Sequence, residues 1–74
     1  MVSSRLEVVD SGEFVREWVA PSGDVTAETT DEQLERISRD WRKQAGEEGV
    51  SIDGSLSEAL VDLRNWLRGY PPRL

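Results

Sequence analysis

The chain has 74 residues, of which 36% are hydrophobic and 32% charged, and it contains neither cysteine nor histidine. This length fits one small domain spanning residues 1–74. The missing residue types exclude disulfides, thiol nucleophiles and imidazole acid–base catalysis. Apolar runs are too short for a transmembrane helix of about 20 residues, and none follows Met1 to Arg5 as in a signal peptide. We therefore expect a soluble, cytoplasmic protein.

The balance of charge narrows the classes of partner. Nine basic residues against fifteen acidic ones give a net charge of −6. Non-specific attraction to nucleic acid and to anionic membranes comes from Lys and Arg, so we expect neither a membrane nor direct binding to nucleic acid. An acidic surface instead favours a basic partner protein, including one that itself binds nucleic acid.

The first thirty residues predict three strands joined by turns. Residues 5–9, 14–20 and 25–29 are rich in β-branched, aliphatic or aromatic types. Turn-forming residues fill the short connections at 10–13 and 21–24. Short connections favour an antiparallel β-meander.

A short helix over residues 13–20 is the alternative to the second strand. The apolar side chains of this run would share one helical face: Phe14, Val15, Trp18 and Val19. Asp10 and Glu13 would form a capping box at its start. Gly12 would lie in the first turn, however, and β-branched and aromatic residues are indifferent helix formers, so the strand is preferred.

The second half of the chain predicts two amphipathic helices. The first covers residues 31–45, after a capping box formed by Thr30 and Gln33. The second covers residues 57–68, and the tail of residues 70–74 follows it. A brief extended piece at 50–52 interrupts the loop between the two helices.

The apolar residues of both helices recur at spacings of three and four, which gives each helix one buried face. We expect contact between the helices through Leu34, Ile37, Trp41, Leu60, Leu63 and Leu67. The predicted fold is therefore α+β, with a three-stranded antiparallel β-meander followed by two α-helices packed on one face, in the order β-β-β-α-α.

The sequence offers little for catalysis. Its serines lack a histidine to activate them, and no glycine-rich phosphate-binding motif occurs. A chain this short is also expected to leave little room for a cleft of about 300 Å³ or more. We therefore expect no enzyme, no catalytic, cofactor-binding or metal-binding residues, and no small-molecule substrate.

Three tryptophans give the strongest indication of an interaction surface. Trp18 and Trp41 are expected in the core, but Trp66 lies about a third of a turn away from the apolar stripe of its helix. Tyr70 follows Trp66 at a spacing of four, and the pair is flanked by basic residues, which gives a candidate surface of Trp66, Tyr70, Arg68 and Arg73. Because the core of so short a chain is marginal, docking on a partner protein or forming a homodimer would add stability. The predicted function is a small acidic protein-interaction module that acts through its C-terminal helix.

A second hypothesis is a dimeric DNA-binding regulator. From Val25 onward, a short β run, a helix, a Gly-containing loop at 48–51 and a second amphipathic helix resemble the order of ribbon-helix-helix proteins. Residues 25–29 contain no Arg, Lys, Asn or Gln with which to read base edges. The interaction module is therefore the preferred interpretation.

Overall fold

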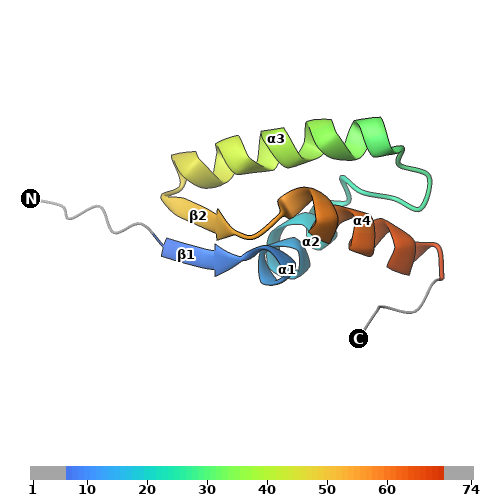
Figure 1. The fold of residues 1–74 in the computed structure, drawn as a ribbon, viewed down its shortest axis with the longest axis horizontal. Coiled ribbons are helices and arrows are strands. Elements are labelled where there is room, and N and C mark those ends of the chain that lie inside the picture. Colours follow the sequence, from blue (N-terminus) through green and yellow to red (C-terminus); the bar gives the residue numbers. More distant parts are fainter. Residues whose placement is uncertain (1–6, 70–74) are drawn as a thin grey trace, which may run out of the picture.

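The computed structural model of the protein describes residues 7–69. Its elements are, in chain order, β1 (Glu7–Asp10), α1 (Ser11–Phe14), the π-helix η1 (Val15–Val19), α2 (Ala20–Ser22), α3 (Asp31–Glu47), β2 (Val50–Asp53) and α4 (Leu56–Leu67). The two strands lie side by side, the long α3 runs along one side of the molecule, and α1, α2 and α4 lie together at the carboxyl ends of the strands (Figure 1). The fold is α+β.

The two strands are parallel. Glu7 lies opposite Val50, and Asp10 lies opposite Asp53. Parallel neighbours need a long crossover connection, which the helices between residues 11 and 47 supply. The expected three-stranded antiparallel meander is therefore wrong. The extended piece at 50–52, which the sequence placed in a loop, belongs to the partner of the first strand.

Residues 14–20, expected as the second strand, are helical. Asp10 begins this helical segment, because its Oδ2 atom accepts hydrogen bonds from the N–H groups of Gly12 (3.0 Å) and Glu13 (3.3 Å). The face turned to the core consists of Phe14, Val15 and Val19. Capping and burial together outweigh the low intrinsic helix propensity of these residues. The alternative over residues 13–20 was the correct one.

The π-helical turn η1 has a local cause in Pro21. Proline lacks an N–H group, and in an α-helix its ring would clash with the carbonyl of the residue four positions earlier, which here is Glu17. In the wider turn, the Ala20 N–H group donates to the Val15 carbonyl, five residues earlier. This geometry brings Val15 and Ala20 to the same side of the segment.

Residues 25–29, expected as the third strand, form a turn instead. The Thr29 hydroxyl accepts a hydrogen bond from the Thr26 N–H group at 2.8 Å, and the Thr29 N–H group donates to the Thr26 carbonyl at 3.1 Å. Threonine and serine side chains stabilise such turns by replacing backbone hydrogen bonds. Val25 is buried in the core beside this turn. The ribbon-helix-helix order needs a strand here, so that order is not present.

Both helices expected in the second half are formed. Thr30 caps α3 through a complete capping box with Gln33, and the Ser55 hydroxyl caps α4 by accepting from the Glu58 N–H group at 3.2 Å. The two helices pack on each other as expected, although Leu67, one of the residues expected in this contact, is 40% exposed and Leu63 borders a groove. α3 also packs on β2, whereas α4 packs on α1 and η1. The largest fully buried side chains are Phe14, Val19, Leu34, Leu56 and Leu60.

The three tryptophans have different environments. Trp41 is buried as expected, and its Nε1 atom donates to Asp24 at 3.1 Å. Trp18 is 38% exposed and stacks on Phe14 with 5.4 Å between ring centroids, so its expected place inside the core is wrong. Trp66 is 59% exposed. In residues 7–69, no helix is both long and apolar enough to cross a membrane.

Candidate functional site

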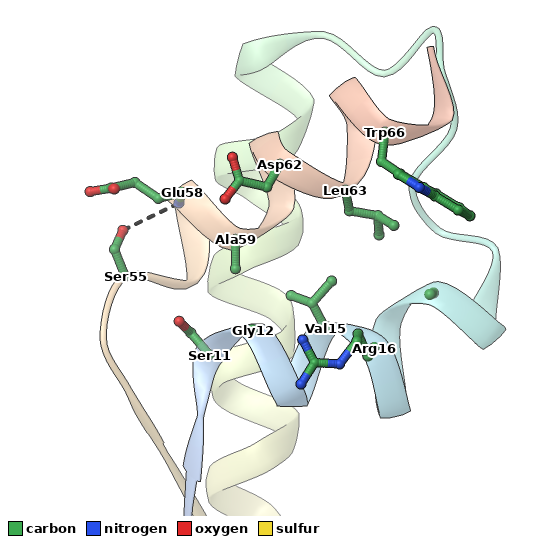
Figure 2. A pocket seen from close by; sticks show the side chains of 11 residues that line it. Ser11, Gly12, Val15, Arg16, Ser55, Glu58, Ala59, Asp62, Leu63 and Trp66 are labelled. Carbon is green, nitrogen blue, oxygen red and sulfur yellow. Dashed lines mark hydrogen bonds between the residues drawn. The ribbon is translucent and has the colours of Figure 1, made fainter. Parts of the chain in front are cut away.

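A groove of about 760 Å³ lies between α4 and the helical segment formed by α1, η1 and the start of α2. Ala59, Leu63 and Trp66 project from α4 toward the opposite helix, and Val15 projects back toward them (Figure 2). Ala20 completes this apolar lining on the opposite wall. The groove is open to solvent and lies within the 300–1,000 Å³ range of ligand-binding pockets. The expectation that so short a chain leaves little room for a cleft is wrong.

The spacing of residues along α4 explains this apolar wall. Leu56, Leu60 and Arg64 lie four residues apart and are buried. Ala59, Leu63 and Trp66 follow at spacings of four and three, which places them on the neighbouring helical stripe. The short α1 and η1 cover this second stripe only partly, so Leu63 is half-buried and Trp66 largely exposed.

Charged side chains line the groove asymmetrically. Glu58 and Asp62 lie one turn apart on α4, and Arg16 lies on the opposite wall (Figure 2). The side chains of these three residues form no ion pair or hydrogen bond with each other or with any other part of the described chain, residues 7–69. Within this part of the chain, no side chain is paired with these three charges.

The serines at the end of the groove have structural roles. The Ser55 hydroxyl accepts the hydrogen bond that caps α4 (Figure 2). The Ser11 hydroxyl lies against Gly54, where an added Cβ atom would be 3.1 Å from the Ser11 oxygen. Gly54 has a φ of +93°, a backbone conformation that favours glycine. With these serines in structural roles, the groove presents an apolar lining and a charged rim to a bound molecule, which suits recognition by shape and charge.

The structure describes two residues of the candidate surface that the sequence predicted, Trp66 and Arg68. Trp66 lines the groove. Arg68 lies away from it and donates from Nε to the Ala27 carbonyl at 2.6 Å, so it holds the turn before α3 against the end of α4. Tyr70 and Arg73 lie outside the described residues. Trp66 lines the groove together with Val15 and Arg16 of η1, which the sequence-based surface did not include.

The opposite wall of the groove was missed by sequence reasoning. Val15, Arg16 and Ala20 belong to the segment that was expected as a strand. The signal that could have found them was the helical face of that segment together with its Asp10 cap. Both features supported the helix over residues 13–20, which was the less favoured prediction. The sequence therefore did not predict a helix beside α4 at this position.

No protein-family model matches the chain, and no curated protein or solved structure is significantly similar to it.

Proposed function

We propose that the protein is a small, non-enzymatic interaction module that holds a basic segment of a partner protein in the groove between α4 and η1. The observation that carries this proposal is the position of Trp66, which is 59% exposed yet lines an apolar groove with Leu63 and Val15. Tryptophan is enriched among the residues that dominate binding energy at protein interfaces. A partner side chain in the groove would bury apolar surface on both walls.

Charge complementarity supports a basic occupant. Glu58 and Asp62 outnumber Arg16 on the groove rim, and the whole chain carries a net charge of −6. A negative field of this kind speeds the approach of a positively charged partner and rejects acidic ones. It also opposes a second copy of this chain, because two acidic proteins would have to approach each other.

The experiment uses Trp66→Ala with Trp18→Ala as a matched control. Trp18 is also partly exposed, but it stacks on Phe14 and does not line the groove. A protein captured from host extract by the immobilised wild type would be purified, and its dissociation constant measured by calorimetry against all three proteins. We expect Trp66→Ala to weaken binding by about 30-fold or more, as loss of a dominant interface residue does. Trp18→Ala should bind as the wild type does.

Stability measurements separate a binding role from a structural one. Because Trp66 is largely exposed, we expect Trp66→Ala to retain the wild-type melting temperature within a few degrees. Equal binding of the captured protein by Trp66→Ala and the wild type would overturn the proposal. So would a Trp66→Ala protein that is unfolded, since Trp66 would then belong to the core.

A further inference from the structure

We infer that the occupant of the groove is an amphipathic α-helix that carries two basic residues one turn apart on one border of its apolar face. This inference rests on the proposed function and specifies the partner's chemistry at the same site. Three features of the groove carry it: the walls are helices, the apolar lining extends over two turns, and two acids without an ion-pair partner in residues 7–69 lie on one rim.

The backbone of a segment bound in the groove needs hydrogen-bond partners. Both walls of the groove are helical, so their backbone N–H and C=O groups are mostly used within the helices themselves. An extended peptide buried there would find few backbone partners, and unsatisfied buried amides are costly. A helix brings its own backbone hydrogen bonds and needs only side-chain contacts. The groove therefore selects a helical ligand over an extended one.

The apolar lining of the groove extends over two turns of α4. Ala59 and Trp66 are seven residues apart, which corresponds to about 10 Å along α4, and Leu63 lies between them. A helix lying alongside α4 presents apolar side chains over the same two turns at positions i, i+4 and i+7. The spacing of apolar side chains on such a helix matches the spacing of Ala59, Leu63 and Trp66 along α4.

The acidic residues on the groove rim have the spacing of one helical turn. Glu58 and Asp62 are four residues apart on the same rim, so their carboxylates follow the pitch of α4. Lysine or arginine residues four apart on a neighbouring helix repeat at the same pitch and can reach both acids. Arg16 on the other wall disfavours a basic residue on that side. The basic pair is therefore expected on one border of the ligand's apolar face.

The test uses a synthetic helical peptide of about 18 residues, which exceeds the length at which isolated helices are marginal. It carries leucines at i, i+4 and i+7, with two lysines four apart on one border of this stripe and alanine or glutamine elsewhere. A second peptide has glutamates in place of the two lysines. We expect calorimetry to show the lysine peptide binding about 10-fold or more tightly than the glutamate peptide, with a preference that weakens as salt is added.

Charge reversal in the protein provides the matched comparison. The double variant Glu58→Lys, Asp62→Lys should prefer the glutamate peptide. The control variant Asp40→Lys, Glu47→Lys makes the same change in net charge on exposed positions of α3, away from the groove, and should keep the wild-type preference. Circular dichroism of both variants checks that they remain folded. If the Glu58→Lys, Asp62→Lys variant unfolds, Asp62→Lys alone is used, because Asp62 lies beyond the capped first turn of α4. This single variant should lose most of the preference for the lysine peptide.

The possible results separate this inference from the proposed function. If neither peptide binds while the captured partner still depends on Trp66, the helical ligand is wrong and the interaction module remains. Equal binding of the two peptides by the wild type would contradict the inference that the ligand carries a basic pair. A preference of the Asp40→Lys, Glu47→Lys control for the glutamate peptide would contradict it as well. Sedimentation of the wild type as a dimer that Trp66→Ala converts to a monomer would assign the groove to a second copy and overturn both.

Discussion

Arg64 of α4 and Asp31 of α3 form an ion pair in which the cation is buried and the carboxylate is exposed. Only 10% of the Arg64 side chain is accessible, against 84% of the Asp31 side chain. The same Nη1 atom of Arg64 also donates to the Thr29 carbonyl at 3.1 Å, next to the residue that caps α3. Arg64 therefore ties α4 to the start of α3, on the opposite side of α4 from the groove rim.

This asymmetry predicts unequal effects of removing the two partners. Asp31→Asn leaves a buried cation without its counter-charge, a change that costs about 3–5 kcal/mol in fully buried pairs. Because Asp31 is exposed and solvent screens the pair, we expect a smaller loss of about 1–2 kcal/mol in the free energy of unfolding. Arg64→Met removes the buried charge itself, and with it the buried Nε atom that has no hydrogen-bond partner within residues 7–69. We therefore expect Arg64→Met to lower the free energy of unfolding by less than Asp31→Asn does.

Urea denaturation of Asp31→Asn, Arg64→Met and the control Glu32→Gln measures these differences. Glu32 is the neighbouring acid in the first turn of α3, so its variant isolates the general effect of a negative charge at a helix N-terminus, about 0.3–1 kcal/mol. A larger loss for Arg64→Met than for Asp31→Asn would show that the contacts of Arg64 outweigh its cost of burial.

The parts of the fold that could be predicted are those with local causes. Thr30 and Ser55 each supply a capping hydroxyl before an amphipathic run, so α3 and α4 could be located from neighbouring residues alone. The pairing of β1 with β2 has no such local signal. It joins two four-residue strands that are separated by 39 residues, from Ser11 to Gly49, and only the packed helices between them bring them together.

The core contribution of α4 differs from its sequence-based description. Leu60 is fully buried, whereas Leu63 is half-buried beside the groove. We expect Leu60→Ala to lower the free energy of unfolding by about 2–5 kcal/mol, because it leaves a cavity in the closed core. Leu63 borders solvent, so Leu63→Ala should lower the free energy of unfolding by only about 1–2 kcal/mol. Chemical denaturation of the two variants gives the comparison, and equal losses would mean that Leu63 belongs to the closed core.

The candidate site could be predicted from the sequence on one wall only. Trp66 was distinguished by its offset from the apolar stripe that the sequence predicts for α4, which runs through Leu56, Leu60, Leu63 and Leu67. The opposite wall depends on whether residues 14–20 are helical, and for that segment intrinsic propensity and capping point in opposite directions. Burial of its apolar face in the tertiary structure decides between them, and a single sequence does not contain that information.

The helical state of this segment can be tested through its cap. Asp10→Ala removes the acceptor for the Gly12 and Glu13 N–H groups, and we expect it to lower the free energy of unfolding by about 1 kcal/mol. Asp10→Ser retains an acceptor at this position and should recover most of the loss. If the segment were a strand, the two substitutions would have similar effects on urea denaturation.

Gly12→Ala tests the same cap from its other side. A Cβ atom added at Gly12 would lie 3.1 Å from the Asp10 Oδ2 atom, so the capping carboxylate has to shift by a few tenths of an ångström. This shift opposes the gain of about 0.5–1 kcal/mol that alanine brings to a helix. In the Asp10→Ala background this conflict is absent, and we expect Gly12→Ala to become stabilising there. Gly46→Ala in α3, where an added Cβ atom meets nothing within 4 Å, is the control and should stabilise the protein in both backgrounds. Additive effects of Asp10→Ala and Gly12→Ala would show that the two residues do not share a helix cap.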